Sequence, residues 1–582
     1  MKKHIYIITF CVILLSNNSI FAQKDSRILS NQNYFPTWFD SVKLGIMIHY
    51  GLYSIPSYSD KEQYAEWFYK GLISNDTLRI NFQKRIFGEN FTYFDYMPLF
   101  KAEMFDANSW IALFKRAGAK YIVFSSKHHD GFCLWDTKTT SKNSMRTPAN
   151  KDFLKELKEA CNKQDIRFGL YYSLMEWHNP YYKWTIDTLG LDKYVDKFLI
   201  PQFKELVDLY EPSLVFADGD WDFDYKQLRS QEMVNYLIDK VGKDEVIVNN
   251  RWGVGNPYGF LTPEYSAGIK EKNRPWSECR SLARSFGLNR ISPLEDYFSA
   301  EDLIKHFVQL VSLGGGLMLN VAPSADGQIP LLQQERLLQL GDWLSINGEA
   351  IYGSKPYYKS FDEKIMTYEI YSPTLDFDWV RNAPIKNCTE DNFTIDWQNE
   401  YTPKYDETLT FILNADEQAE ISISLDGELQ YNGKATKYED LQFSFEFKQN
   451  KTYKFFVYYQ EEDIDAHLSL LIKDKNGKTF TFKGNRDWKG KVSWKQPTMY
   501  YTTNRNNLYA ISIEELDSSI SFHLDKVPNK NMKILLLGSE SKELEWKYNN
   551  EVLTIDLSNL TMRDIKSKYA YIFKLENYLD KR

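Results

Sequence analysis

Cysteine is scarce in this chain, and the few cysteines form no recognisable pattern. Among 582 residues there are only 5 cysteines, and one of them lies in the apolar N-terminal stretch. The spacing of the other four matches neither a zinc site nor a small disulfide scaffold; they are Cys133, Cys161, Cys279 and Cys388. We therefore expect most of these four to be buried free thiols.

The chain also lacks a basic block and, beyond its first residues, a long apolar run. It carries 71 Lys and Arg against 79 Asp and Glu, so its formal net charge is −8. The absence of clustered positive charge argues against a nucleic-acid partner. No later segment is long and apolar enough to span a membrane. A chain of this length exceeds one hydrophobic core, which predicts two to four domains.

Residues 1–22 have the three parts of a secretory signal peptide. Lys2 and Lys3 form a basic region, Ile5–Leu15 forms an apolar run, and small and polar residues lead to Ala22. The apolar run is too short for a membrane-spanning helix. We expect cleavage near Ala22 and export of the protein to the periplasm or the extracellular space.

From residue 35 to about 355, apolar strand candidates alternate with amphipathic helix candidates. The predicted strands are Leu44–His49, Tyr121–Ser126, Phe168–Leu174, Leu214–Ala217, Val246–Asn249 and Leu317–Val321. The predicted helices are Phe153–Lys163, Val195–Leu209, Met233–Val241 and Ala300–Leu313. Such alternation over about 300 residues predicts an α/β fold, namely a (β/α)8-like TIM barrel.

After residue 355 the pattern changes to alternating β-type runs. They are separated by Asn, Asp, Lys and Gly, and examples are Thr408–Leu413, Glu420–Leu425, Phe443–Phe447, Tyr453–Tyr459 and Leu508–Ile513. This pattern is typical of β-sandwiches and predicts two of them after the barrel.

Polar and aromatic side chains follow several of the predicted barrel strands. The clearest case is YIVFSSKHHDGFCLWD, in which a buried strand runs directly into His128 and His129. An α/β barrel places its chemistry at this end of its strands. Other residues of the same kind are His49, Glu66, Trp67, Tyr171, Tyr172, Asp218, Arg251 and Glu264.

These segments together resemble the α-L-fucosidases of glycoside hydrolase family 29. The resemblance rests on WFDSVKLGIMIHYG, AEWF, YIVFSSKHHDGFCLWD, FGLYYSLMEW, LVFADGDW, VNNRWG, RSFGLNR, GGLMLNVAPSADG and GDWLSINGEAIYG. They occur in order between about residues 38 and 353. The resemblance implies a barrel over residues 35–355 and a retaining, exo-acting glycosidase that releases terminal α-L-fucosyl residues.

The resemblance identifies Asp218, in LVFADGDW, as the catalytic nucleophile. A retaining glycosidase uses a carboxylate to trap the sugar covalently, and a strand end holds such a group rigidly. Alternation along the strand would place Asp220 on the same face, so periodicity alone does not separate the two acids.

Two glutamates are candidates for the general acid/base. Glu264 follows Arg251 by thirteen positions in a PEY segment, where some family members carry this residue, and it is our choice. Other family members place it in a W-E-x-C segment. This chain reads Trp276-Ser277-Glu278-Cys279 there, with the glutamate displaced by one position.

The remaining residues resemble the family's fucose-binding groups. His49, His128 and His129 would bind hydroxyls beside Glu66 and Trp67, and Arg251 would hold the carboxylates or a hydroxyl. Only one of Tyr171 and Tyr172 can face inward. Trp221 and Phe286 would form an apolar wall for the C6 methyl group of fucose. The His-rich set lacks metal-ligand spacing, and the resemblance implies neither a metal nor any other cofactor.

The segment between the barrel and the end of the chain resembles a PA14-type β-sandwich, over about residues 370–490. The resemblance rests on NFTIDWQNEYTP, TLTFILNADEQAEISISLDG and KTYKFFVYYQEED. The turn Asn414–Glu417 lacks the Asp-Asp pair of calcium-dependent sugar binders in this class. Residues 495–582 resemble the family's C-terminal β-sandwich.

We therefore expect an exported α-L-fucosidase that acts on fucosylated oligosaccharides or glycoprotein glycans. The alternatives are a fucose-binding protein with impaired catalysis and a related α-L-galactosidase, whose substrate differs only at C6. The sequence leaves the linkage preference and the oligomeric state open.

Overall fold

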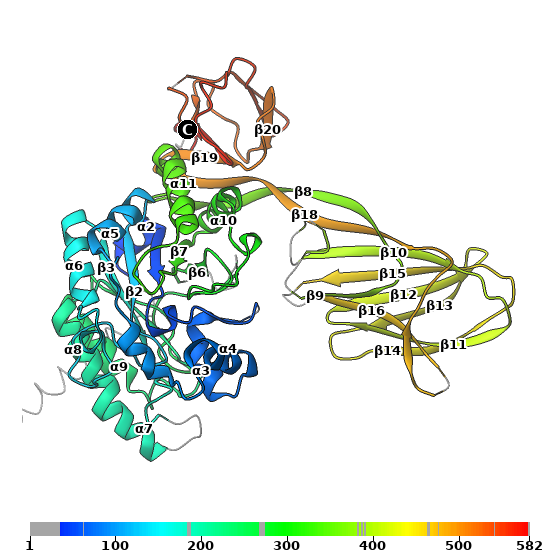
Figure 1. The fold of residues 1–582 in the computed structure, drawn as a ribbon. Coiled ribbons are helices and arrows are strands. Elements are labelled where there is room, and N and C mark those ends of the chain that lie inside the picture. Colours follow the sequence, from blue (N-terminus) through cyan, green and yellow to red (C-terminus); the bar gives the residue numbers. More distant parts are fainter. Residues whose placement is uncertain are drawn as a thin grey trace, which may run out of the picture. The chain divides into compact units, whose positions relative to one another are not determined.

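The computed structural model describes residues 35–61, 63–182, 188–266, 274–380, 383–385, 388, 392–462, 466–474, 476–540 and 542–579. The predicted signal peptide, residues 1–22, lies outside these ranges. The chain divides into two compact units (Figure 1). The first comprises residues 1–360 and 500–582, and the second is Phe361–Met499.

A parallel sheet forms the centre of the first unit. Its strands are β1 (Leu44–Ile48), β2 (Tyr121–Lys127), β3 (Arg167–Ser173), β4 (Leu214–Asp218), β5 (Ile247–Val248), β6 (Ser277–Ser281) and β7 (Gly316–Val321). They lie in the order β5-β4-β3-β2-β1-β7-β6. Most of their side chains are buried, as expected for a parallel sheet covered on both faces.

Isolated bridges connect the two edge strands of this sheet. Asn249 pairs with Phe260, Leu261 with Trp276, and Glu264 with Cys279, all in parallel orientation. Residues 260–264 thus lie between β5 and β6 and give the sheet a barrel-like closure. The predicted TIM-barrel fold is confirmed.

Helices surround the sheet (Figure 1). The longer ones are α4 (Thr77–Phe87), α5 (Ala107–Arg116), α6 (Phe153–Gln164), α8 (Ile200–Tyr210), α9 (Ser230–Val241), α10 (Ala300–Ser312) and α11 (Leu331–Asn347). The short ones are α2 (Thr37–Val42), α3 (Phe68–Ile73) and α7 (Thr188–Tyr194). Several begin at a capping side chain. Asp152, for example, accepts a hydrogen bond from the backbone of Lys155 at the start of α6. In the described part of the chain, no helix combines the length and the apolar character needed to cross a bilayer.

The second unit consists of antiparallel strands in two sheets. The first sheet contains β10 (Phe393–Tyr401), β12 (Gln418–Leu425), β13 (Glu428–Ala435), β15 (Tyr453–Glu461) and part of β18 (Trp488–Asn504). The second contains β9 (Asp376–Val380), β11 (Glu407–Ala415), β14 (Leu441–Phe447), β16 (Ala466–Lys473) and β17 (Thr479–Thr481). Alternate side chains of β10 and β15 are buried, and the unit has its own core around Trp397, Phe411 and Val457.

The C-terminal part belongs to the first unit. The strands β19 (Asn507–Ser512), β21 (Ile534–Leu536) and β24 (Tyr571–Leu575) continue the sheet that contains β18. A small sheet contains β20 (Ser519–His523), β22 (Trp546–Asn549) and β23 (Val552–Asp556). Trp343 on α11 donates its indole hydrogen to Ala570 O at 3.0 Å, so the helix and the C-terminal strands pack together.

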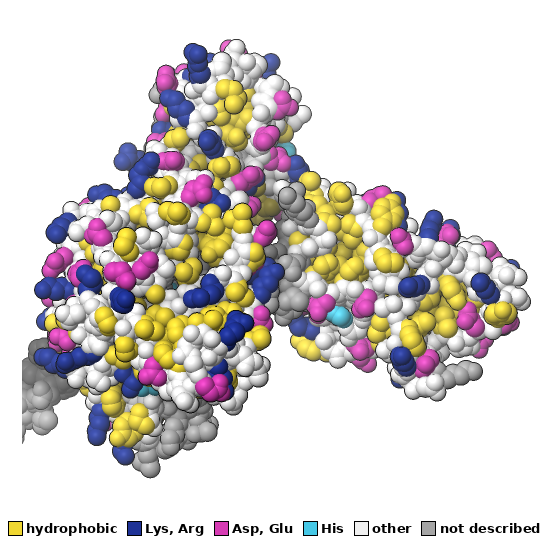
Figure 2. Space-filling model, viewed as in Figure 1, with side chains coloured by type: hydrophobic (Ala, Val, Ile, Leu, Met, Phe, Trp, Pro, Cys, Tyr) yellow, Lys and Arg dark blue, Asp and Glu magenta, His cyan; other side chains and the backbone are white. Residues whose placement is uncertain are grey.

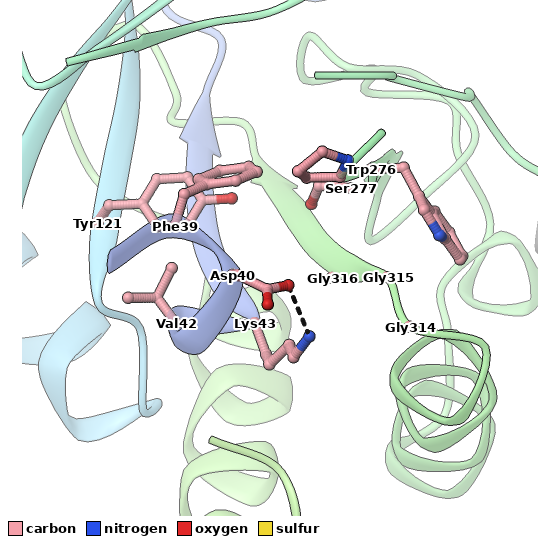
Figure 3. A pocket seen from close by; sticks show the side chains of 11 residues that line it. Phe39, Asp40, Val42, Lys43, Tyr121, Trp276, Ser277, Gly314, Gly315 and Gly316 are labelled. Atoms are coloured by element: carbon pink, nitrogen blue, oxygen red, sulfur yellow. Dashed lines mark ion pairs between the residues drawn. The ribbon is translucent and has the colours of Figure 1, made fainter. Parts of the chain in front are cut away.

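A very small cavity lies at the amino ends of β1, β6 and β7 (Figure 3). Its volume is about 10 Å³, and its edge carries the ion pair between Lys43 and Asp40, at 3.7 Å. Such a volume is roughly what one water molecule needs. The cavity is too small for a substrate, and α/β barrels carry their chemistry at the opposite, carboxyl end of the strands.

Charges of both signs are interspersed on the face of the molecule in Figure 2.

Three of the four predicted thiols, Cys133, Cys161 and Cys279, are free and buried, as expected.

Candidate functional site

A cavity of about 110 Å³ opens at the carboxyl ends of the barrel strands. It is lined by Met47, His49, Tyr64, Glu66, Trp67, His128, Tyr171, Phe216, Asp218, Trp221, Arg251, Glu264, Cys279 and Phe286. These residues come from segments far apart in the sequence, and they meet because parallel strands end at one edge of the barrel.

Asp218 is the last residue of β4 and stands in the middle of a polar network. Its Oδ2 atom accepts a hydrogen bond from Tyr171 Oη at 2.6 Å and lies 3.5 Å from His129 Nε2. Its Oδ1 atom is 3.3 Å from Arg251 Nη1. Burial alone would raise the pKa of Asp218, but the contacts with His129, Arg251 and Tyr171 outweigh it and hold the pKa well below the usual value. Asp218 is therefore an anion at neutral pH.

Arg251 links Asp218 to a second carboxylate, that of Glu264. Arg251 Nη1 contacts Glu264 Oε1 at 2.5 Å. The guanidinium is fixed by Thr262, which accepts from Nε at 3.0 Å through its hydroxyl and from Nη2 at 2.8 Å through its carbonyl. One nitrogen thus contacts both carboxylates, so Asp218 and Glu264 face the same small space.

Glu66 is a third carboxyl group in the cavity, carried by a 3-10 turn, Ala65–Trp67. Its Oε2 atom accepts hydrogen bonds from Gly287 N at 2.6 Å and Ser285 Oγ at 3.0 Å. Burial raises the pKa of Glu66 to about 7 against the opposing effect of these donors. A side chain at position 287 would collide with Glu66, so the close approach requires glycine.

The three predicted histidines lie together at the ends of β1 and β2. The rings of His49 and His128 are 5.5 Å apart, and those of His128 and His129 are 4.3 Å apart. Burial lowers the pKa of His49 to about 4 and that of His128 well below its usual value. Both rings are therefore neutral at neutral pH.

Hydrogen bonds orient two of these rings. His49 Nδ1 lies 2.7 Å from Asn320 Oδ1. The side-chain nitrogen of Asn320 donates to Phe286 O, so the atom facing His49 is the amide oxygen, which accepts a hydrogen bond from His49 Nδ1. His129 Nδ1 donates to Ser173 Oγ at 2.7 Å, because that hydroxyl gives its own hydrogen to Met175 O. In contrast, His128 Nδ1 is buried without a hydrogen-bond partner among the described residues.

Tyr171 and Tyr172 point in opposite directions, as strand alternation requires. Tyr171 faces the cavity and Asp218. Tyr172 instead donates to Leu199 O at 3.0 Å and lies 3.1 Å from Gln202 Oε1, outside the cavity lining. The expectation that either tyrosine could serve the site is therefore corrected: Tyr172 packs against α8, and its hydroxyl is already bonded there.

The two predicted wall residues differ in exposure. Phe286 is 5 % exposed and packs against His49, with ring centroids 5.2 Å apart. Trp221 is 44 % exposed and stacks on Trp67, with centroids 6.1 Å apart and an angle of 23° between the ring planes. Phe286 is thus an inner wall, whereas Trp221 stands at the rim.

The alternative acid/base, Glu278, lies elsewhere. It is buried on β6, where Arg280 Nε contacts it at 2.9 Å and His306 on α10 also bonds to it. The next residue, Cys279, lines the cavity, so alternation turns Glu278 to the outside of the barrel.

Asp220, the alternative to Asp218, does not line the cavity either. Strand β4 ends at Asp218, and Gly219, at φ +80°, breaks the alternation.

Four residues of the cavity lining were not predicted from the sequence, namely Met47, Tyr64, Phe216 and Cys279. Met47 precedes His49 by two positions on β1, and Phe216 has the same relation to Asp218, so strand alternation could have found both. Cys279 had no such signal, because β6 was not recognised as a strand. Within the described ranges, no three His, Cys, Asp or Glu side chains are placed so that they could hold a metal ion.

Known protein families match three consecutive parts of the chain. The sequence model of the α-L-fucosidase family matches residues 16–349, a PA14 domain model matches 350–484, and the α-L-fucosidase C-terminal domain model matches 493–576. An α-L-fucosidase of Dictyostelium discoideum is 38 % identical over 339 residues, which cover 56 % of this chain and 73 % of that protein. Human tissue α-L-fucosidase is 37 % identical over 334 residues, covering 55 % and 70 %.

Solved structures show the same fold. The Thermotoga maritima α-fucosidase in complex with fucose superimposes with a TM-score of 0.62 at 24 % identity, covering 93 % of this chain and 97 % of that one. An α-L-fucosidase isoenzyme of Paenibacillus thiaminolyticus gives a TM-score of 0.57 at 20 % identity, covering 92 % and 97 %. The family match over more than half of the sequence, together with these identities, shows that the chain belongs to the α-L-fucosidase family of glycoside hydrolases and carries a PA14 domain between its barrel and its C-terminal domain.

Proposed function

We propose that this protein is an exo-acting, retaining α-L-fucosidase that hydrolyses terminal α-L-fucosyl residues of glycans. The observation that carries the proposal is the pair of carboxylates, Asp218 and Glu264, which one nitrogen of Arg251 contacts in a small cavity. Two carboxyl groups flanking one small cavity are the minimum that glycoside hydrolysis requires.

In the first step, a carboxylate oxygen of Asp218 attacks the anomeric carbon and the bond to the leaving oxygen breaks. Glu264 gives its proton to that oxygen, so the leaving group departs as an alcohol and the sugar remains as an ester of Asp218. The low pKa of Asp218 supports its role as nucleophile, because the group is charged before substrate binds.

In the second step, Glu264 takes a proton from water, and the resulting hydroxide attacks the anomeric carbon. The ester bond to Asp218 breaks, and fucose leaves with its original configuration. One negative charge is present at each stage, on Asp218 before substrate reacts and on Glu264 in the ester intermediate, and Arg251 contacts both groups and offsets it in either place.

The separation of the carboxylates supports retention. Because Arg251 Nη1 lies 3.3 Å from Asp218 and 2.5 Å from Glu264, the contacting oxygens cannot be farther apart than these two distances together. That limit lies below the roughly 6.5–9.5 Å typical of inverting enzymes and is close to the roughly 5–5.5 Å of retaining ones.

The rest of the cavity suits one small sugar. His128 Nδ1, buried and unpartnered among the described residues, is available to a hydroxyl, and unpartnered buried polar atoms call for such a role. We assign His49, Glu66 and Trp67, which line the cavity, to the hydroxyl groups of the sugar. His129 does not line the cavity, and its Nε2 atom lies 3.5 Å from Asp218 Oδ2, so we assign it to holding Asp218. The deep apolar side, where Phe286 and Met47 lie, would take the C6 methyl group. A C6 hydroxyl would be rejected only weakly there, so slow turnover of α-L-galactosides is expected.

Purified protein assayed on aryl α-L-fucosides tests this proposal. Asp218→Ala should lower kcat by about three or more orders of magnitude. Its matched control, Asp220→Asn, should lose far less, because Asp220 does not line the cavity. Turnover by a folded Asp218→Ala variant at the parent rate would refute the mechanism. A folded parent that binds fucose without turnover would leave the alternative of a fucose-binding protein with impaired catalysis.

A second pair of variants tests the acid/base. Glu264→Gln should reduce the rate more for a leaving group that needs protonation, such as a sugar, than for one that does not, such as fluoride. Glu278→Gln should reduce both rates by the same small factor. The opposite result would transfer the role to Glu278.

We also propose that the protein is exported after cleavage near Ala22, on the strength of the basic, apolar and small-residue pattern of its first 22 residues. N-terminal sequencing of protein recovered from outside the cytoplasm would test this, and an uncleaved N-terminus would contradict it.

A further inference from the structure

Trp221 is the most exposed tryptophan in the described part of the chain. Its side chain is 44 % exposed, although it lines the cavity together with residues that are almost completely buried. The exposed part of this indole ring gains none of the free energy that removal of apolar surface from water provides. Such a ring is available for contact with a ligand.

The ring is also held in place. Trp221 stacks on Trp67, and its edge contacts His129, with ring centroids 5.5 Å apart. The next residue, Asp222, is fixed as well, because its Oδ2 atom accepts a hydrogen bond from Tyr182 Oη at 2.7 Å. Since little freedom remains to be lost on binding, the exposed face of Trp221 is preorganised.

The size of the cavity determines what can lie on that face. At about 110 Å³ it is much smaller than the roughly 300–1,000 Å³ pockets that hold drug-sized ligands, so it accommodates one small ring. The group attached to that ring must therefore lie outside. Glu264, the proposed proton donor to the leaving oxygen, is 33 % exposed at the same mouth.

The acidic residues next to Trp221 in the sequence, Asp220 and Asp222, favour a neutral occupant. Burial and then the charge of Asp218 raise the pKa of Asp220, while Arg251 acts in the opposite direction. Adding an anionic sugar beside these carboxylates would be unfavourable, whereas the apolar face of a neutral pyranose stacks on an indole without charge repulsion.

We propose that Trp221, backed by Trp67, is the stacking platform of a leaving-group subsite for the neutral pyranose ring that carries the fucosyl residue. This inference rests on the proposed α-L-fucosidase function. It assigns to Trp221 a contact with the leaving sugar in place of the C6 methyl group of fucose.

The test compares two substrates that share the fucosyl group. One is α-L-fucosyl fluoride, which has no leaving ring, and the other is a neutral fucosyl-galactose disaccharide. Trp221→Ala should lower kcat/KM for the disaccharide about tenfold more than kcat/KM for the fluoride, the size expected for loss of one good ring contact. Trp221→Phe, which keeps an aromatic face, should recover most of this difference. The basic limb of the pH profile on the disaccharide should not move, because the proton donor is unchanged.

Controls separate the possible outcomes. Leu209→Ala, an exposed position on α8 outside the cavity, should affect both substrates equally. A disaccharide whose galactose carries a carboxylate at C6 should be a poorer substrate than the neutral one. If Trp221→Ala lowered kcat/KM equally for the fluoride and the disaccharide, the proposed subsite would be wrong. It would also be wrong if the parent had the same kcat/KM for the charged and the neutral disaccharide. If the parent turns over neither substrate, the proposed function itself fails.

Discussion

Arg251 determines how the two proposed catalytic carboxylates are arranged. A single guanidinium nitrogen reaches both Asp218 and Glu264, while Thr262 fixes the other side of the group. Periodicity could not pair the two carboxylates, because 46 positions separate them in the numbering. The family resemblance paired them, through the spacing of thirteen residues from Arg251 to Glu264, and the structure brings both side chains to Arg251.

Adjacent residues show where sequence reasoning stops. Alternation predicted that one of Tyr171 and Tyr172 faces the cavity, but it could not say which, because that depends on which face of β3 the barrel encloses. The same limit applies to Asp218 and Asp220. There the outcome depends on Gly219, whose positive φ ends the strand pattern.

The buried carboxyl group of Glu66 leads to a pH prediction. Its pKa is raised from 4.5 to about 7 in the folded protein, so the protonated form favours folding. The stabilisation is complete below the unfolded pKa and is lost as pH rises through about 7. Raising the pH from 5 to 8 should therefore lower the parent's free energy of unfolding by up to about 3 kcal/mol through this group.

Thermal melts at the two pH values measure this effect. Glu66→Gln should show a smaller decrease in Tm from pH 5 to pH 8 than the parent, because the amide does not titrate. Glu295→Gln, at an exposed position, should behave like the parent. An identical decrease in the parent and in Glu66→Gln would mean that Glu66 does not titrate in this range.

At the scale of elements, a buried ion pair joins the last residue of β2 to the loop that follows β3. Lys127 Nζ lies 2.8 Å from Glu176 Oε1, and both side chains are almost completely buried. Trp177 N also donates to His129 O at 2.8 Å. Burial would raise the pKa of Glu176, but its polar contacts, of which those with Lys127 come first, together outweigh burial and lower the pKa. The pair therefore connects the strand that precedes the histidines to the neighbouring loop.

Breaking this pair should destabilise the barrel strongly. Glu176→Gln leaves a buried ammonium group without its counter-charge, which costs about 3–5 kcal/mol. We expect Tm of the barrel to decrease by roughly 5–10 °C. Glu301→Gln, which removes a solvent-exposed pair with Lys305 on α10, should change Tm by no more than about 2 °C. Replacing Lys127 and Glu176 together by methionine should restore part of the loss, and equal shifts in the two single variants would contradict the argument.

The elements themselves were predictable to different degrees. Long apolar strands such as β1, β2 and β7, and periodic helices such as α6 and α10, lie within one or two residues of their expected bounds. Strand β6 was missed, because its sequence, SECRS, has one apolar side chain. Its backbone pairs with β7, and only Cys279 needs to be apolar, because Glu278 and Arg280 satisfy each other outside the barrel.

At the scale of the whole molecule, each of the two compact units has a core of its own. Trp397 is completely buried within the second unit, and Trp343 is buried where α11 meets the C-terminal strands of the first. Separate cores predict separate unfolding transitions, because cooperativity depends on shared packing.

Calorimetry of two matched variants tests this independence. Trp397→Ala should destabilise the second unit by about 3–5 kcal/mol, shift one transition, and leave kcat on an aryl α-L-fucoside within about twofold of the parent. Trp343→Ala should shift the other transition. If both variants moved a single common transition, the two units would fold as one cooperative body.

The two ends of the inserted unit lie next to each other, on two paired strands. The chain leaves the first unit along β8 (Lys355–Ser372) and returns along β18, and these two strands pair with each other. Since β8 and β18 pair, the inserted segment connects them as the loop of a β-hairpin does, whatever the length of the segment. Closing a loop costs entropy that grows only with the logarithm of its length. An inserted domain whose ends meet in this way can therefore be gained, lost or exchanged without altering the folding of the barrel.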